Sequence, residues 1–283
     1  MQFWKMQGLG NDYVVIDNRQ GQVSNKDASK WAKYLCERYL GVGADGLLLV
    51  CPSQTADIKM RMFNADGSEA EMCGNGIRCF SKYCYENGIM KKSEFCIETL
   101  AGIKPVWLSI KDSQILAIET DMGVPNWQRV AVPMIGEGTC VDQPLQVGNE
   151  IYQVSVLSMG NPHCVSFVED IEGFPVGLVG ERLETHPAFP QRTNVAFVEV
   201  RNCCEMSVRV WERGCKETLS CGTGACASFA VAKKLGKVQD KVIVHLRGGD
   251  LQITAGEKGN IYMKGPAEKV FEGKLFRGNR FDF

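Results

Sequence analysis

Hydrophobic and polar residues alternate in two short stretches that lie far apart in the chain, Lys59–Phe63 and Ser207–Trp211. This period of two is typical of a β-strand that covers a core with one face. After each stretch come a polar loop, a Cys-Gly-x-Gly turn and a helical pattern, predicting helices at about Ile77–Asn87 and Ala225–Leu235. A glycine follows each predicted helix and would end it, because glycine adopts the left-handed conformation at little cost.

The rest of the pattern mixes strands with a few helices. A helix with a capping-box-like start is predicted over Ser24–Leu40. The stretches Val106–Ile110 and Ile115–Ile118 predict a hairpin around Lys111–Ser113. The expected fold class is therefore α/β.

The strand–loop–helix plan is a sequence repeat. A shift of 148 residues lays Lys59–Gly76 over Ser207–Gly224 with five identities in eighteen positions, where chance gives about one. The identical pairs are Arg61/Arg209, Glu69/Glu217, Cys73/Cys221, Gly74/Gly222 and Gly76/Gly224. A second match, Gly10-Asn11 with Gly160-Asn161, lies upstream at nearly the same offset. A duplication explains both matches and predicts two pseudo-symmetric domains, with a boundary near Asp121–Pro125.

Composition narrows the class of protein. The chain has 283 residues, 45% of them hydrophobic, and a formal net charge of −1, so nothing attracts it globally to nucleic acid or anionic membranes. Its start lacks the features of a signal peptide, and no stretch is apolar for long enough to span a bilayer. We expect a cytoplasmic protein, in which most of the thirteen cysteines are small buried residues rather than a disulfide framework.

Two of these cysteines stand in a special setting, Met72–Gly76 and Ser220–Gly224. Paired glycines expose backbone N–H groups, and the following helix adds the positive end of its dipole, so each turn favours a carboxylate or a thiolate. Inverting a stereocentre through its α-proton needs a base on one face and an acid on the other. A thiolate and a thiol at equivalent repeat positions, Cys73 and Cys221, would supply both without a metal or pyridoxal. The alternative is that both are packing residues beside tight turns.

Seven blocks surround these features in order, from residue 8 to about residue 227. They are Gly8-Leu9-Gly10-Asn11-Asp12, Phe63-Asn64-Ala65-Asp66-Gly67-Ser68, Cys73-Gly74-Asn75-Gly76-Ile77-Arg78-Cys79, Ser158-Met159-Gly160-Asn161-Pro162-His163-Cys164, Arg192-Thr193-Asn194-Val195, Glu212-Arg213-Gly214 and Cys221-Gly222-Thr223-Gly224-Ala225-Cys226-Ala227. Together they make the chain resemble the diaminopimelate epimerases over most of its length.

The resemblance implies a fold and an activity. The fold is two similar domains, each a barrel-like mixed or antiparallel sheet around a central helix. Residues 1–120 and 121–269 would form them, with 270–283 returning to complete the first. The activity is the cofactor-independent interconversion of LL- and meso-diaminopimelate, on the route to lysine and peptidoglycan precursors. The expected partners are a small amino-acid substrate and a second copy of the chain in a homodimer.

The resemblance also implies roles for individual residues. Cys73 and Cys221 would be the proton-transfer pair. Substrate contacts would come from Asn11, Asn64, Gly74, Asn75, Asn161, Asn194, Glu212, Arg213, Gly222 and Thr223. His163 and Glu212 would tune the pKa values of the cysteines. Gly46 departs from members that carry an amide side chain near this position, which puts selectivity in doubt.

Several of these residues have plainer interpretations. Asn11 and Asn161 follow glycine and could form turns, Glu212-Arg213 could be a surface ion pair, and His163 could be a core histidine. The spacing Gly41-x-Gly43-x-x-Gly46 fits a dinucleotide fingerprint by letter only, because a helix precedes it and a strand follows.

Other classes of protein fit less well. The cysteine spacings do not match zinc sites, and only three histidines are present, so no metal is expected. A redox sensor built on the two thiols would need an output surface that is not evident. Within the same superfamily, a proline-racemase-like enzyme or a phenazine-type isomerase is the nearer alternative. The paired cysteines argue against the second, and the Asn and Glu-Arg set argues against proline.

Overall fold

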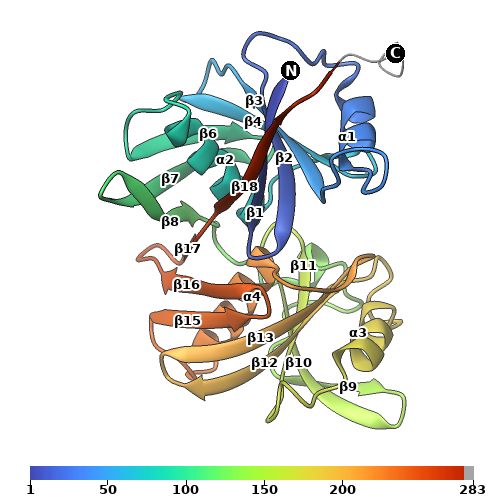
Figure 1. Ribbon diagram of the computed structural model, residues 1–283. Coiled ribbons are helices and arrows are strands. Elements are labelled where there is room, and N and C mark those ends of the chain that lie inside the picture. Colours follow the sequence, from blue (N-terminus) through green and yellow to red (C-terminus); the bar gives the residue numbers. More distant parts are fainter. Residues whose placement is uncertain (277–283) are drawn as a thin grey trace. The chain divides into compact units, whose positions relative to one another are not determined.

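A computed structural model describes residues 1–276 of the chain, and contacts divide it into two compact units (Figure 1). The first unit comprises Met1–Thr120 together with the chain from Gly265 onward, and the second comprises Asp121–Lys264. The chain thus returns to the first unit earlier than the expected Val270. Residues 277–283 of the expected returning segment lie outside the described residues.

In the first unit a mixed sheet runs in the order β18, β1, β2, β3, β4, β6, β7, β8, with the short β5 beside β4. The β2–β3 and β4–β6 pairs are parallel and the other neighbours are antiparallel. The bounds are β1 (Gln2–Gly8), β2 (Asn11–Asp17), α1 (Ala28–Cys36), β3 (Gly46–Cys51), β4 (Ile58–Asn64), β5 (Glu69–Ala70), α2 (Gly74–Glu86), β6 (Glu94–Thr99), β7 (Gly102–Lys111), β8 (Gln114–Asp121) and β18 (Glu268–Lys274).

The second unit repeats this topology, in the order β9, β10, β11, β12, β13, β15, β16, β17, with β14 beside β13. Its parallel pairs, β11–β12 and β13–β15, correspond to those of the first unit. The bounds are the 3-10 helix η1 (Arg129–Ala131), β9 (Gln143–Val147), β10 (Glu150–Ser158), β11 (Pro162–Phe167), α3 (Val176–Glu184), β12 (Asn194–Asn202), β13 (Glu205–Glu212), β14 (Lys216–Thr218), α4 (Gly222–Lys234), β15 (Lys241–Leu246), β16 (Gly249–Ala255) and β17 (Ile261–Gly265). The predicted duplication is confirmed.

The correspondence extends to the outermost strand. In the second unit β9 precedes β10 in the chain and pairs with it in antiparallel fashion. In the first unit the same place beside β1 is taken by β18, which comes from the other end of the chain. The sheet of the first unit therefore depends on residues that follow the second unit.

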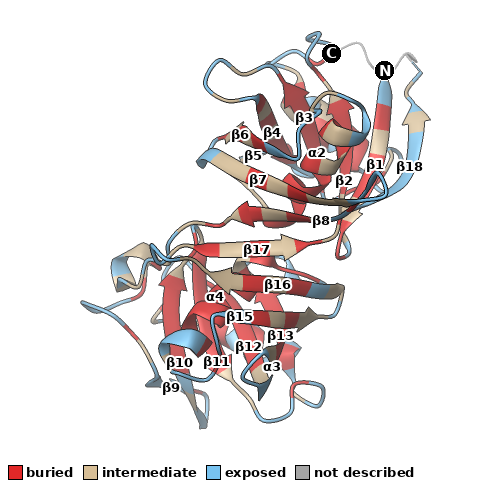
Figure 2. Cartoon of the chain, turned by 90° about the vertical axis from the view of Figure 1, so that its left-hand side faces the viewer, coloured by how far each residue is buried: buried red, intermediate tan, exposed pale blue. Residues whose placement is uncertain are grey.

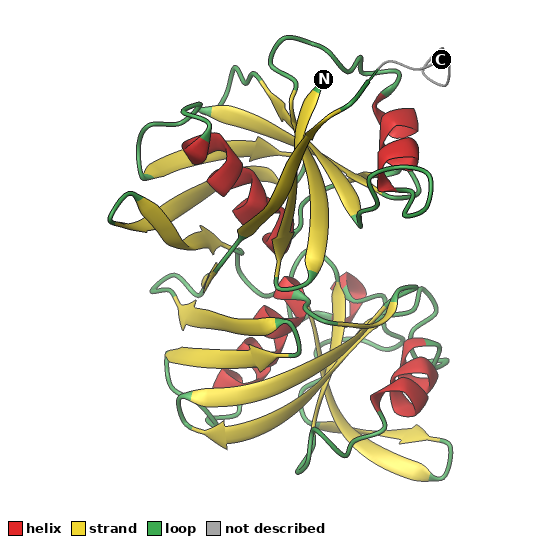
Figure 3. Ribbon diagram, in the orientation of Figure 1, coloured by secondary structure: helices red, strands yellow, loops and turns green. Residues whose placement is uncertain are grey.

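Each unit wraps its sheet around one helix, α2 or α4, and carries a second helix, α1 or α3, outside (Figures 1 and 3). In the first unit β2 and β3 are buried on both faces, because alternate residues point to α2 and to α1 (Figure 2). Val15 and Leu48 pack in the cluster around α2, whereas Val14 and Leu47 pack in the cluster around α1. This explains why these strands lack clear alternation in the sequence.

Four predicted elements need correction or detail. Helices α2 and α4 begin at Gly74 and Gly222, so the glycines after each cysteine are first-turn helical residues rather than a separate turn. Helix α1 is shorter than Ser24–Leu40, because Glu37 leaves the helical conformation with ψ at 122°. The predicted hairpin is confirmed, and its two turn residues both have positive φ, as a type I′ turn requires.

None of the helices formed by residues 1–276 is both long enough and apolar enough to cross a membrane.

Candidate active site

A bidentate ion pair fixes the hairpin that leads to each cysteine. Arg61 on β4 donates from Nε and Nη2 to Glu69 on β5, over 2.7 and 3.0 Å. Arg209 on β13 donates to Glu217 on β14 in the same way, over 2.8 and 3.1 Å. Such a fork restricts the orientation of both side chains. The identical Arg and Glu of the repeat therefore hold the chain just before the cysteine in each unit.

Cys73 and Cys221 are the N-cap residues of α2 and α4, both with extended backbone. The first-turn N–H groups of a helix have no partner within the helix and carry the positive end of its dipole. Each sulfur therefore lies where a negative charge is stabilised, as a thiolate or as a carboxylate of a ligand. Cys73 is half-buried and Cys221 is buried.

In the first unit Cys73 shares a hydrogen-bonded cluster with residues at the start of β2. Tyr13 Oη lies 3.1 Å from Cys73 Sγ and also donates to Asn11 Oδ1. The same Asn11 oxygen lies 3.6 Å from Cys73 Sγ and accepts from Asn75 Nδ2 over 3.4 Å. The structure thus brings together three predicted site residues with Tyr13, which the sequence analysis did not single out.

Two further residues orient this cluster. Asp45 Oδ2 accepts from Asn11 Nδ2 over 2.7 Å, which leaves the amide oxygen of Asn11 facing Cys73. Arg78, fully buried on α2, donates from Nη2 to Asn75 Oδ1 over 2.9 Å and from Nε to Pro266 O over 2.9 Å. Neither residue was predicted to have a role, although Arg78 lies within one of the quoted blocks.

Asn64 and Gly46 are partners in the β3–β4 register, at the same end of the sheet. Asn64 is exposed and donates from Nδ2 to Ser68 Oγ over 3.0 Å. A Cβ atom at Gly46 would lie 2.8 Å from the carbonyl oxygen of Phe63 and 3.2 Å from the ring of Tyr13. A side chain at position 46 would therefore collide with the strand beside it and with the Tyr13 ring.

In the second unit the sulfur of Cys221 contacts two polar groups of its own helix. Gly224 N–H donates to Cys221 Sγ over 3.4 Å, and Thr223 Oγ1 lies 3.5 Å from the same sulfur. Both contacts come from the first turn of α4, so they depend only on the helix beginning at Gly222.

The predicted amide and Glu-Arg residues of the second unit hold one another in place. Asn194 is buried, donates from Nδ2 to Pro162 O over 2.7 Å and accepts from Arg213 N over 2.9 Å. Glu212 Oε1 accepts from Thr218 Oγ1 over 2.5 Å. The guanidinium of Arg213 is on an exposed residue and donates to Gln191 O over 3.2 Å.

His163 is fully buried on β11, opposite Asn194 in the parallel register with β12. Its Nε2 lies 3.0 Å from Asn161 Oδ1, and its Nδ1 has no hydrogen-bond partner among residues 1–276. Burial lowers the pKa of His163 to about 3, and the positive charge of Arg213 contributes to the shift. The imidazole is therefore neutral near pH 7.

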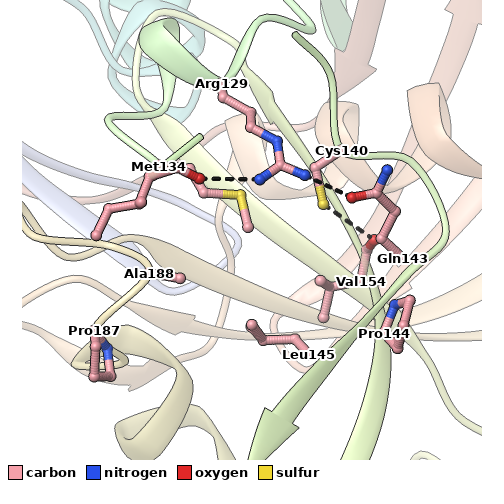
Figure 4. A pocket seen from close by; sticks show the side chains of 10 residues that line it. Arg129, Met134, Cys140, Gln143, Pro144, Leu145, Val154, Pro187 and Ala188 are labelled. Atoms are coloured by element: carbon pink, nitrogen blue, oxygen red, sulfur yellow. Dashed lines mark hydrogen bonds between the residues drawn. The ribbon is translucent and has the colours of Figure 1, made fainter. Parts of the chain in front are cut away.

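A pocket of about 300 Å³ in the second unit contains none of these residues (Figure 4). Its lining is Arg129, Met134, Ile135, Cys140, Gln143, Pro144, Leu145, Val154, Pro187 and Ala188. The Arg129 guanidinium donates to Ile135 O and Gln143 Oε1, so its charge is already engaged. In the part of the chain that the structure describes, no three His, Cys, Asp or Glu side chains gather in a metal-binding arrangement.

The family profile described as diaminopimelate epimerase matches residues 3–128 and 155–270. The chain belongs to the diaminopimelate epimerase family. It is 47% identical over 275 residues to the diaminopimelate epimerase of Pelotomaculum thermopropionicum, covering 97% of this chain and 98% of that protein. It is 49% identical to the diaminopimelate epimerase of Moorella thermoacetica, covering 96% and 98%.

Solved structures of other families share the fold of this diaminopimelate epimerase family member. A phenazine biosynthesis protein of the PhzF family from Bacillus anthracis has a TM-score of 0.71 and 18% identity, covering 98% of this chain and 99% of that chain. A probable proline racemase from Agrobacterium radiobacter K84 has a TM-score of 0.71 and 15% identity, covering 99% and 94%. At this identity the likeness concerns the fold alone.

Proposed function

We propose that this protein interconverts LL- and meso-diaminopimelate by a two-base mechanism, in which one of Cys73 and Cys221 removes the α-proton and the other donates its own proton to the opposite face. The observation that carries the proposal is the N-cap position of both cysteines, at equivalent places in two duplicated units. We infer the substrate from the family assignment, and the duplication provides one acid–base group for each face of the stereocentre.

The chemistry follows from the two helix N-termini. One sulfur, as the thiolate, removes the α-proton, and the other, as the thiol, donates a proton to the opposite face. The two protonation states are exchanged after one turnover, which prepares the enzyme for the reverse reaction. First-turn N–H groups at Gly74-Asn75 and Gly222-Thr223 would bind the substrate carboxylate and stabilise the charge that develops as the proton leaves.

The remaining polar residues suit a substrate with two zwitterionic ends. The Arg213 guanidinium matches a carboxylate in geometry, and Glu212 with the amides of Asn64 and Asn161 offers acceptors for an ammonium group. Asn11 and Asn194 have both ends of their amides engaged within the protein. We therefore assign these two residues mainly to positioning Cys73 and Arg213.

The product class places the reaction in the supply of lysine and of peptidoglycan precursors. We propose a cytoplasmic location, because the mechanism requires reduced thiols and all thirteen cysteines are free. We also propose a homodimer, as the family resemblance implies. Analytical ultracentrifugation of the reduced protein tests the homodimer, and a monomer at micromolar concentration would contradict it.

The deciding experiment is incubation with LL-diaminopimelate in deuterated water under reductant. We expect α-deuterium in the meso product and little in the recovered LL substrate at early times. Cys73→Ala and Cys221→Ala should each reduce turnover by at least ~10²-fold, the lower end for loss of a proton-transfer group. Cys84→Ala and Cys226→Ala, the same change deeper in the same two helices, should retain it. Full activity in either N-cap variant would end the two-base proposal.

The alternative left by the sequence analysis is a proline-racemase-like activity. The same assay with L-proline separates the two. Turnover of proline with none of diaminopimelate would reverse the assignment.

A further inference from the structure

Tyr13 is the polar side chain nearest to Cys73 outside the helix that Cys73 caps. Its ring is fully buried in the cluster around α2, and its hydroxyl oxygen lies 3.1 Å from Cys73 Sγ. The hydroxyl also donates to Asn11 Oδ1, which itself lies 3.6 Å from the same sulfur. The three polar atoms therefore form a triangle in which every pair is in contact.

The number of protons in this triangle changes with the state of Cys73. The Asn11 oxygen can only accept, and its amide nitrogen is held by Asp45. When Cys73 is a thiol, both its S–H and the tyrosine O–H can donate to the Asn11 oxygen. When Cys73 is a thiolate, the sulfur becomes an acceptor, and the tyrosine hydroxyl can rotate to donate to it.

We propose that Tyr13 is a positioning residue for the epimerisation, whose hydroxyl donates to the Cys73 thiolate and turns to Asn11 Oδ1 when Cys73 takes up the proton. The proposal rests on the proposed two-thiol mechanism. In this role Tyr13 stabilises and orients the sulfur of Cys73, one of the two reacting sulfurs, and does not contact the substrate.

A glycine beside Tyr13, Gly46, leaves space for the tyrosine ring. Gly46 is the partner of Tyr13 in the parallel β2–β3 register, and a Cβ atom there would lie 3.2 Å from the ring. A Cβ atom at Gly76 on α2 would lie 3.4 Å from Tyr13 Cζ, which is ordinary contact. Of these two glycines, only Gly46 is needed to leave space for the ring. This gives Gly46 a function: it leaves room for the tyrosine that reaches Cys73.

The duplication places His163 at the equivalent position in the second unit. Tyr13 lies two residues after Asn11 on β2, and His163 lies two residues after Asn161 on β11. Each contacts the amide oxygen of its asparagine. The two units therefore use the same strand position for a buried polar ring, and they differ in which ring they use.

The ionisable groups around the triangle keep the Tyr13 hydroxyl protonated, so it remains a hydrogen-bond donor. Burial raises the pKa of Tyr13 well above its ordinary value, and the neighbouring Cys73 adds to the rise. Cys79 on α2 and Asp45 before β3 act in the same direction. Arg78 faces Asn75 rather than the hydroxyl. The Tyr13 hydroxyl therefore keeps its proton through the working range of pH.

The test is site-resolved alkylation with iodoacetamide as a function of pH, read by mass spectrometry at Cys73 and Cys221. Tyr13→Phe removes one oxygen and leaves Asn11 Oδ1 with Asn75 as a donor. We expect the Cys73 alkylation midpoint to rise by about one unit, so that its rate at pH values below both midpoints falls about tenfold, while the Cys221 midpoint stays. Tyr83→Phe removes a hydroxyl from the same core cluster and should move neither.

A second substitution acts in the opposite direction. Replacement of Tyr13 by 3-fluorotyrosine makes the hydroxyl a stronger donor, and the Cys73 midpoint should fall. In the epimerase assay Tyr13→Phe should lower kcat more than it changes KM. It should reduce kcat/KM equally in the two directions, because the equilibrium between the isomers does not depend on the enzyme.

The outcomes separate the two proposals. An unchanged Cys73 midpoint in Tyr13→Phe, in a protein with wild-type circular dichroism, would overturn the role of Tyr13 whatever happened to activity. A shifted midpoint in a protein that does not epimerise diaminopimelate would overturn the proposed function and leave the Tyr13–Cys73 contact supported.

Discussion

Gly76 and Gly224 are identical residues at equivalent places in the two units, yet alanine should affect them in opposite ways. A Cβ atom at Gly224 would lie 3.0 Å from Val210 Cγ2 and 3.3 Å from both Cβ and Sγ of Cys221. A Cβ atom at Gly76 would meet its nearest neighbours at 3.4 to 3.6 Å, which is ordinary contact. One added methyl group therefore overfills the site at Gly224 and does not overfill the site at Gly76.

The expected magnitudes follow from two opposing terms. Alanine favours a helix over glycine by roughly 0.5–1 kcal/mol, and this gain applies to both variants. Overpacking a filled site costs roughly 1–3 kcal/mol, and this cost applies to Gly224→Ala alone. Gly76→Ala should therefore be stabilising by up to ~1 kcal/mol, and Gly224→Ala should be the less stable of the two by ~1–3 kcal/mol.

Urea unfolding followed by circular dichroism measures the difference. With a slope of about 2 kcal/mol per molar urea, the two midpoints should differ by on the order of 1 M. Gly224→Ala should also lower kcat about tenfold, because the methyl group displaces the sulfur of Cys221 and lengthens the bond from the Gly224 N–H. Equal stability of the two variants, or a more stable Gly224→Ala, would show that the packing around Cys221 is looser than described.

Three further predictions use the same two units. Arg209→Met should cost about 1–3 kcal/mol of unfolding free energy, because the backbone carbonyls of Ile171 and Phe174 lose their donor while Glu217 keeps its ion pair with Arg247 over 3.3 Å. The more exposed Arg61→Met should cost less, and urea titration compares the two variants. Burial lowers the pKa of His163 to about 3, so below about pH 6.5 only the unfolded chain takes up a proton at this residue. The folded protein should therefore lose stability as pH falls, by up to ~1.4 kcal/mol per pH unit. His163→Gln should lack that slope between pH 6.5 and pH 4, and an identical slope in the variant would contradict the assignment. Mild oxidation should join Cys73 to Cys221 and stop turnover, and dithiothreitol should restore it; peptide mapping that found neither cysteine in the bond would count against two adjacent thiols.

The duplication could be predicted because the residues that hold the scaffold are also the residues that repeat. Arg61 with Glu69 and Arg209 with Glu217 are identical pairs in the sequence, and the structure shows both as forks that fix the approach to a cysteine. The alternating stretches were correctly predicted as strands, but the expectation of one covered face was wrong for Ser207–Trp211, whose residues are all buried. The two helix starts were placed too late, because glycine in a first turn looks like a turn signal.

The contacts of Cys73 could not be predicted, because they depend on elements that are distant in the sequence, whereas the described contacts of Cys221 come from its own helix. Tyr13 stands in an apolar run and looks like a core residue. Its hydroxyl reaches Cys73 only because β2 lies beside α2 in the fold. Asp45 could not be predicted as a site residue either, because its hydrogen bond to Asn11 depends on the parallel pairing of β2 with β3. Lining up Asn11 with Asn161 would have placed Tyr13 on His163, which is the one sequence signal that pointed to it.

The differences between the units bear on how one proton is shared between two sulfurs. A two-base reaction starts from either protonation state of the pair, and the two states are equally populated in the free enzyme only when the two thiols hold the proton with comparable strength. Both sulfurs cap a helix, but only Cys221 Sγ accepts a hydrogen bond from a first-turn N–H, that of Gly224. The hydroxyl beside the sulfur also comes from different places, Tyr13 on β2 for Cys73 and Thr223 on α4 for Cys221. Asn75 occupies the position of Thr223 in the first unit and supplies no hydroxyl there. We infer that the tyrosine compensates for this difference, so that loss of either hydroxyl would leave the proton held unequally by the two sulfurs.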